Sequence, residues 1–218
     1  MPLRLVSALF VSRRSIYKHL PRVECFDRSR GIANFAALTP VIAHPPCRCW
    51  SKFLSAQANP PDRNAEMQLG LWAVETVIRC GGVLEQPAGS KLWEAAKLPA
   101  VGDNRDPFCY TVYLEQSWFG FPTPKPTWIL VCGVPRAKLP ALPFVLMPKS
   151  LVPFNQLNQA ERSRTMKPLA VWLCQIARAT WWSLPDRANL PGRSRAKPAG
   201  SKPFYPHVNT ADVQSKSL

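Results

Sequence analysis

The stretch Val41-Ile42-Ala43-His44-Pro45-Pro46-Cys47-Arg48-Cys49-Trp50-Ser51 joins an apolar run to a turn that opens with two prolines. The apolar run predicts a buried strand, and the prolines restrict the backbone of the turn that follows it. A stiff turn at the end of a buried strand holds its next side chain at the rim of a sheet. That side chain is Cys47, so we take Cys47 as the candidate nucleophile.

Downstream of this turn, the sequence predicts a helix and a second strand. The helix begins near Asp62 as its N-cap, repeats apolar residues at helical spacing and stops at Gly81-Gly82. Residues 83–85 then form a short apolar strand that ends in Glu85. Strand, helix and strand in this order form a βαβ unit with parallel strands. Cys47 and Glu85 are therefore expected side by side at the carboxyl edge of the sheet.

The remaining elements extend the same pattern. We expect further strands over residues 3–11, 23–27, 40–43, 110–115 and 127–133, and helices over residues 15–20 and 165–180. Thr165 is expected to cap the last helix, whose buried face carries Leu169, Trp172, Leu173 and Ile176. The fold class is thus α/β, with a mostly parallel, Rossmann-like sheet and flanking helices.

The charge of the chain points to a polyanionic partner. Its 28 Lys and Arg residues outnumber 13 Asp and Glu residues, which gives a formal net charge of +15. Such a field favours nucleic acid, and an anionic membrane surface is the alternative. No apolar run approaches the roughly 18 residues of a membrane span, so no membrane insertion is expected. Residues 183–218 predict a disordered basic tail behind a folded domain of residues 1–182.

The seven cysteines favour a reducing compartment, because they are odd in number and show no disulfide spacing. We therefore expect a cytoplasmic protein, although the basic, acid-free residues 1–23 are also typical of a transit peptide.

Cys47 itself allows three interpretations. Positive or protonatable groups at His44, Arg48 and Lys52 are expected to lower the pKa of its thiol. The simplest alternative is a cysteine that packs as a small core residue. A metal site is the weakest choice, because Cys47-x-Cys49 lacks the paired Cys-x-x-Cys spacing of zinc sites, and we expect no metal.

Three segments, in this order, resemble the DNA cytosine-5 methyltransferases. His44-Pro45-Pro46-Cys47-Arg48-Cys49-Trp50-Ser51 looks like the family's Pro-Pro-Cys-Gln-x-x-Ser nucleophile loop, with Arg48 in place of Gln. Leu84-Glu85-Gln86-Pro87 is similar to its Glu-Asn-Val strand end. Residues 110–133 look like its Tyr-x-Val…Tyr-Gly-x-Pro-Gln-x-Arg-x-Arg hairpin and the apolar strand behind it. The match covers roughly half of the chain.

The resemblance implies a methyltransferase-type fold and a role for each matched residue. Cys47 would attack C6 of a cytosine that is flipped out of DNA, and Glu85 would hydrogen-bond and protonate the base edge. Separately from the resemblance, Trp50 and Trp118 lie on the loops that flank the proposed pocket, and we expect their indoles to stack on the base. The candidate substrate-binding residues are Pro46, Arg48, Trp50, Ser51, Trp118 and Lys125.

Two departures from the family pattern bear on activity. Ser12-Arg13-Arg14-Ser15 stands where the family has the glycine loop that cradles S-adenosylmethionine, so the resemblance leaves cofactor binding open. The interval after Gly133 is also too short for a target-recognition domain, which implies a partner protein for sequence recognition. The alternatives are an inactive, methyltransferase-like protein that binds nucleic acid or regulates, and an unrelated α/β protein.

Overall fold

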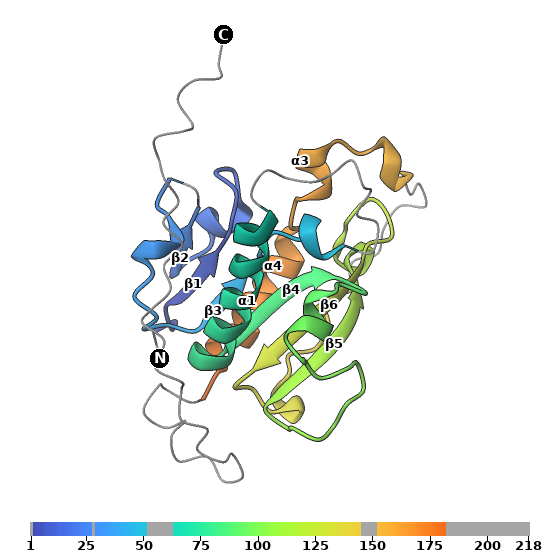
Figure 1. The fold of residues 1–218 in the computed structure, drawn as a ribbon. Coiled ribbons are helices and arrows are strands. Elements are labelled where there is room, and N and C mark those ends of the chain that lie inside the picture. Colours follow the sequence, from blue (N-terminus) through green and yellow to red (C-terminus); the bar gives the residue numbers. More distant parts are fainter. Residues whose placement is uncertain (1, 28, 52–62, 145–151, 182–218) are drawn as a thin grey trace.

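The computed structural model describes residues 2–27, 29–51, 63–144 and 152–181. These residues form a six-stranded sheet with helices on both faces, an α/β fold as predicted (Figure 1). The strand order is β2-β1-β3-β4-β6-β5. The strands are β1 (Val6–Leu9), β2 (Val23–Phe26), β3 (Val41–Ala43), β4 (Gly82–Pro87), β5 (Cys109–Glu115) and β6 (Pro126–Cys132).

The expectation of a mostly parallel sheet is wrong, because the sheet is mixed. Strands β2, β1, β3 and β4 pair in parallel, whereas β6 pairs antiparallel with both β4 and β5. The cause is the short connection between β5 and β6. Residues 116–125, which contain η4 (Gln116–Phe119), return the chain directly, and only a longer crossover could make these strands parallel.

The predicted βαβ unit is confirmed by β3, α1 (Arg63–Cys80) and β4. Val41 pairs with Gly82 and Ala43 pairs with Leu84 in a parallel register. The expected N-cap Asp62 and the predicted tail at residues 183–218 lie outside the described residues. Sequence reasoning therefore recovered the unit that carries Cys47 and Glu85.

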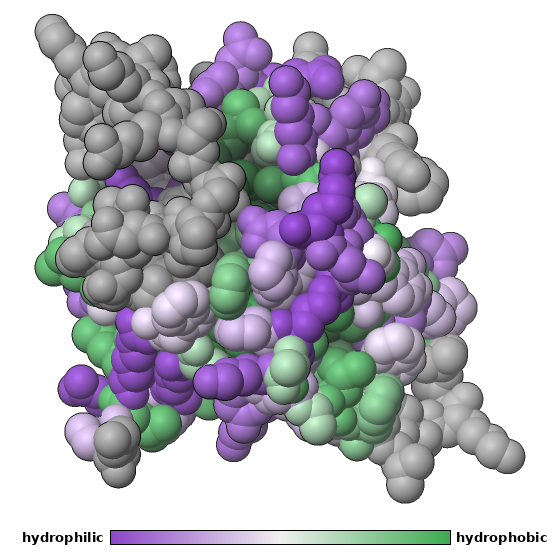
Figure 2. All heavy atoms as spheres, turned by 90° about the horizontal axis from the view of Figure 1, so that it is seen from below, coloured by the Kyte–Doolittle hydropathy of each residue, from purple (hydrophilic) through white to green (hydrophobic). Residues whose placement is uncertain are grey.

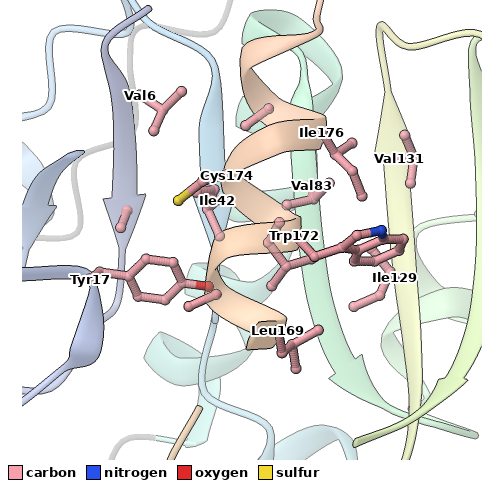
Figure 3. Close-up of a cluster of buried hydrophobic side chains, with 14 of the residues drawn as sticks. Val6, Tyr17, Ile42, Val83, Ile129, Val131, Leu169, Trp172, Cys174 and Ile176 are labelled. Carbon is pink, nitrogen blue, oxygen red and sulfur yellow. The ribbon is translucent and has the colours of Figure 1, made fainter. Parts of the chain in front are cut away.

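Two hydrophobic clusters lie on opposite faces of the sheet. Alternate residues of each strand face α1 on one side and α4 (Lys167–Arg178) on the other, as Val41 and Ile42 do. Figure 1 shows α1 in front of the sheet and α4 behind it, and Figure 3 shows Trp172 of α4 beside Ile129 and Val131 of β6. The predicted buried face of α4 is confirmed, since Leu169, Trp172, Leu173 and Ile176 are all buried.

The start of α4 differs from the prediction. Its N-cap is Met166, which makes no side-chain capping bond, and Thr165 lies one residue earlier. Pro168 near the start of the helix favours this boundary, because proline is tolerated in the first turn, where backbone N–H groups have no helical partner.

Several short elements were not predicted. They are α2 (Leu92–Ala95), α3 (Gln159–Arg162), η2 (Ile32–Asn34), η3 (Arg48–Trp50), η5 (Arg136–Lys138) and η6 (Phe154–Gln156). The expected helix over residues 15–20 is the 3-10 helix η1 (Ile16–His19). In Figure 2, hydrophilic side chains form a central band on the face seen from below. No helix among the described residues is long and apolar enough to cross a membrane.

We predict that Gly82→Ala destabilises the fold severely. Gly82 has φ +117°, and a Cβ atom there would overlap the backbone of Val41 on the neighbouring strand. Gly102→Ala is the matched control, because Gly102 also has a positive φ (+84°) but meets nothing within 4 Å. In urea unfolding, Gly102→Ala should cost about 1 kcal/mol of unfolding free energy and Gly82→Ala at least about 3 kcal/mol. Equal costs would contradict the close approach of β3 and β4.

Candidate active site at the carboxyl edge of the sheet

The parallel register of β3 and β4 brings His44 beside Glu85. His44 follows Ala43, the last residue of β3, and Glu85 follows Leu84, the residue that pairs with Ala43. His44 Nδ1 lies 3.2 Å from Glu85 Oε2, and the two side chains are only 14% and 13% exposed. A buried carboxylate requires hydrogen-bond partners, and the neighbouring strand end supplies the first one.

Further side chains extend this contact into a buried polar chain. The Tyr17 hydroxyl, from η1, lies 2.9 Å from His44 Nε2. On the other side, Gln116 Nε2 donates to Glu85 Oε1 at 2.8 Å and to Thr127 Oγ1 at 3.0 Å. Both carboxylate oxygens of Glu85 are therefore engaged, and the chain spans η1, β3, β4, η4 and β6.

These contacts decide the charge of Glu85. Burial raises the pKa of its carboxyl, but the hydrogen bond from His44, the charge of Lys125 and the hydrogen bond from Gln116 together lower it below the ordinary value. Glu85 is therefore an anion at neutral pH, and it is held in one orientation.

The turn that carries Cys47 is fixed at several points. Gln86 Nε2 donates to the carbonyl oxygen of Pro45 at 2.7 Å, and Lys91 N donates to that of Trp50 at 2.9 Å. Trp50 N in turn donates to the Cys47 carbonyl oxygen at 3.0 Å, with Cys47 as the N-cap of η3. The thiol is thus presented by a rigid turn, as the prolines predicted.

The expected lowering of the Cys47 pKa is wrong. Cys47 is exposed as a residue, yet partial desolvation of its thiol and the nearby Glu85 anion raise its pKa above the ordinary value, and Lys125 opposes them. Arg48 does not act as expected, because its guanidinium forms a two-pronged ion pair with Glu66 of α1. His44 is engaged by Glu85 and Tyr17, and Lys52 lies outside the described residues.

The two predicted stacking tryptophans have different surroundings. Trp50 is 2% exposed and packs in the core against α1, where a Cβ atom at Gly70 would overlap its indole nitrogen. Trp50 therefore offers no ring face to a base, and that prediction is wrong. Trp118 of η4 is half-buried, and its ring lies 5.6 Å from that of Phe144, centroid to centroid.

The other predicted substrate-binding residues also lie on these loops. The charge of Lys125 lowers the pKa of both Glu85 and Cys47. Its Nζ donates a hydrogen bond to the Arg162 carbonyl oxygen at 2.9 Å. Pro46 precedes Cys47 directly and is half-buried, and Ser51 is the C-cap of η3. The structure thus brings Cys47, Glu85 and Lys125 together, and it directs Arg48 and Trp50 elsewhere.

Sequence reasoning missed Tyr17 and Gln116 and misjudged the partner of His44. The strand register could have indicated the contact between His44 and Glu85. Each of them directly follows one residue of the pair Ala43 and Leu84. Tyr17 and Gln116 carried no local signal, since Tyr17 comes from a 3-10 helix 27 residues before His44, and Gln116 lies 31 residues beyond Glu85.

The described residues do not fit S-adenosylmethionine in the place that the resemblance implies. Residues 10–15, after β1, contain no glycine, and Phe10 (φ 60°) packs edge-on against Trp72. In an open α/β sheet the ligand crevice lies where strand order reverses, here between β1 and β3. His44 N donates to the Leu9 carbonyl oxygen at 3.2 Å there, which joins the two strand ends across the crevice.

Among the described residues, no group of three or more His, Cys, Asp and Glu side chains is arranged to hold a metal ion. In comparisons with known proteins, the chain matches no protein-family model and none of the curated proteins.

We predict that Cys47 reacts with iodoacetamide faster than Cys132 in the native protein. Cys47 is exposed, whereas Cys132 of β6 is 1% exposed. Because the Cys47 pKa is raised above its ordinary value of 9.0, its labelling rate should still increase beyond pH 9. Peptide mass spectrometry across a pH series measures both rates. Equal labelling of the two residues, or a Cys47 rate that is already constant at pH 7, would contradict this description.

Proposed function

We propose that this chain acts on a pyrimidine base of nucleic acid, with Cys47 as the nucleophile and Glu85 as the group that holds the base edge. The observation that carries the proposal is that Cys47, an exposed residue, and the fixed Glu85 carboxylate both follow the ends of adjacent parallel strands. Glu85 raises the pKa of the Cys47 thiol, and Lys125 lowers the pKa of both groups. We further propose a Rossmann-like, methyltransferase-type fold that resembles the DNA cytosine-5 methyltransferases. The mixed sheet, with helices on both faces, is compatible with it.

The chemistry of the base explains why these two groups belong together. C5 of cytosine becomes nucleophilic when a thiolate forms a bond to C6 and the C5–C6 double bond opens. The electrons move toward N3, which then takes up a proton, and a carboxylate at the base edge can accept a proton and pass it on. C5 of the adduct takes a proton from water and then loses its original hydrogen to water. The C6–S bond then breaks, the thiolate leaves and N3 gives its added proton back. The cycle uses Cys47, Glu85 and water, and no methyl donor enters it.

The partner in this proposal is DNA, attracted by the net charge of +15. The base must be turned out of the duplex to reach Cys47, at a cost of a few kcal/mol. We propose further that a partner protein supplies sequence recognition and that the chain acts in the cytoplasm.

A second candidate is a methyltransferase-like protein that binds nucleic acid without chemistry. Two observations favour it, namely the raised pKa of the Cys47 thiol and the absence of a glycine in residues 10–15 after β1. In this case the net positive charge attracts the nucleic acid, and Cys47 is a remnant of the nucleophile.

We predict release of tritium from DNA that carries [5-³H]cytosine, without any methyl donor. Cys47→Ser should reduce the rate at least about 100-fold, because the hydroxyl is a far weaker nucleophile than a thiol at neutral pH. Glu85→Gln should reduce it at least about 10-fold, because the amide cannot deliver the proton. Tritium in the solvent is counted after the DNA has been removed.

Cys80→Ala is the control for this experiment, since Cys80 is a buried thiol at the end of α1 and should leave the rate unchanged. Circular dichroism checks that each variant is folded. If the folded wild-type protein binds DNA but releases no tritium, the enzyme proposal fails and the binding-protein candidate takes its place.

We also predict DNA binding that depends strongly on salt and weakly on sequence. If about six phosphates are neutralised, the affinity should fall about 1000-fold between 50 and 200 mM salt. Fluorescence anisotropy with two duplexes of unrelated sequence measures both effects. An affinity that is independent of salt, or a large preference for one duplex, would contradict a binding mode based on net charge.

A further inference from the structure

The buried chain of Tyr17, His44 and Glu85 carries a role beyond holding the site together. Tyr17 is fully buried, and its hydroxyl lies 2.9 Å from His44 Nε2. His44 Nδ1 lies 3.2 Å from Glu85 Oε2. Figure 3 shows the Tyr17 ring beside α4, with its hydroxyl pointing inward. Each nitrogen of the imidazole therefore has a partner, and the partner on the Nδ1 side is the carboxylate of the proposed site.

The tyrosine hydroxyl suits either charge state of His44. A neutral imidazole with its hydrogen on Nδ1 donates to Glu85 and accepts from the hydroxyl at Nε2. A charged imidazolium donates from both nitrogens, and the hydroxyl then accepts from Nε2 after turning about its C–O bond. Burial raises the pKa of Tyr17 well above its ordinary value, with smaller contributions from Cys174, Glu85 and Cys25, so the hydroxyl keeps its proton in both states. Gaining or losing the proton on His44 thus leaves no buried nitrogen without a partner.

We propose that His44 is a positioning residue that stores the proton which Glu85 delivers to the base, and that Tyr17 supports both of its charge states. This role rests on the proposed function, because that function supplies the base that receives the proton. The contacts among Tyr17, His44 and Glu85 are independent of that function. It deepens that function, because it adds the source of the proton to the nucleophile and the base-edge carboxyl.

The proton balance of the step is simple. The Cys47 thiol first gives its proton to water. When the thiolate sulfur bonds to C6, the Glu85 anion accepts the proton of His44 Nδ1 and passes a proton to N3, so Glu85 is again an anion. His44 becomes neutral and accepts a hydrogen bond from Tyr17 at Nε2. In the reverse step the proton returns from N3 through Glu85 to His44, and the C6–S bond breaks. No oxidant or reductant is needed.

The charged and titratable groups around Tyr17, His44 and Glu85 come from several elements. Glu85 on β4 and Tyr17 on η1 contact His44 directly. Lys125, before β6, and Cys47, on the turn after β3, interact with Glu85, while Cys25 on β2 and Cys174 on α4 interact with Tyr17.

The experiment is an NMR titration of the His44 imidazole in the full chain. The chain has three histidines, His19, His44 and His207, so His19→Gln and His207→Gln assign the signals. Tyr17→Phe removes the acceptor for Nε2–H without changing the ring. We expect the His44 midpoint to fall by about one pH unit in this variant. Both charge states lose a hydrogen bond, but a charged N–H without a partner in the core costs more than a neutral nitrogen without one. Glu85→Gln should lower it by a similar amount, and His19→Gln should leave it unchanged.

The tritium release of the proposed function supplies the second readout. The rate requires protonated His44, which is lost as the pH rises through its midpoint. In Tyr17→Phe the fall of the tritium-release rate at high pH should therefore move to lower pH. The size of the move should equal the shift of the His44 midpoint in the titration. An unchanged His44 midpoint in both folded variants overturns the relay, as does a fall of the rate that does not move with the midpoint. If Tyr17→Phe does not fold, Glu85→Gln carries the titration alone, since it leaves Tyr17 in place.

The two proposals fail separately. Absence of tritium release from the wild-type protein contradicts the proposed function. The titration then still decides whether Tyr17 and Glu85 control the charge of His44.

Discussion

The parallel pairing of β3 with β4 is the constraint on which the site depends. It requires a residue without a Cβ atom at Gly82, where the backbone of Val41 is too close for any side chain. From that start the register fixes Ala43 beside Leu84, and the next residues of the two strands, His44 and Glu85, come into contact. The polar chain is therefore a continuation of the sheet. Its orientation follows from backbone hydrogen bonds, and the loops only add partners to it.

The ionised Glu85 has two neighbours in the site. It contacts His44 Nδ1, and it raises the pKa of the Cys47 thiol. At rest the site therefore holds a fixed anion beside a protonated thiol. A base whose edge donates hydrogen bonds to Glu85 would spread that negative charge, and a proton placed on Glu85 would remove it. Either event eases ionisation of Cys47. Nucleophile activation in the proposed cycle is thus coupled to base binding, and an empty site keeps its thiol protonated.

The sequence predicted the parts of the fold that depend on local pattern. Helical spacing and the Gly81-Gly82 stop fixed the end of α1, and β3–α1–β4 placed Cys47 and Glu85 at one edge. The prediction from sequence failed where a residue far away in the sequence determines the direction of a strand or the burial of a side chain. The antiparallel entry of β6 depends on how residues 116–125 fold back, and Trp50 is buried because Gly70 of α1 leaves room for its indole. A basic residue next to Cys47 likewise proved no guide to the thiol pKa, because Glu66 of α1 binds Arg48.

The burial of Trp50 links the core to the proposed chemistry. Trp50 belongs to η3, the short helix that Cys47 caps, and it is packed against α1 and Leu92. Arg48 and Cys49 of the same helix bond to Glu66, so η3 is attached to α1 by packing and by charge. The buried Trp50 ring cannot stack on a base, but its packing holds η3 and the adjoining Cys47 turn in place. A thiol on a turn fixed by α1, Gln86 and Lys91 meets its target in one geometry, which is what a nucleophile that must approach a ring edge requires.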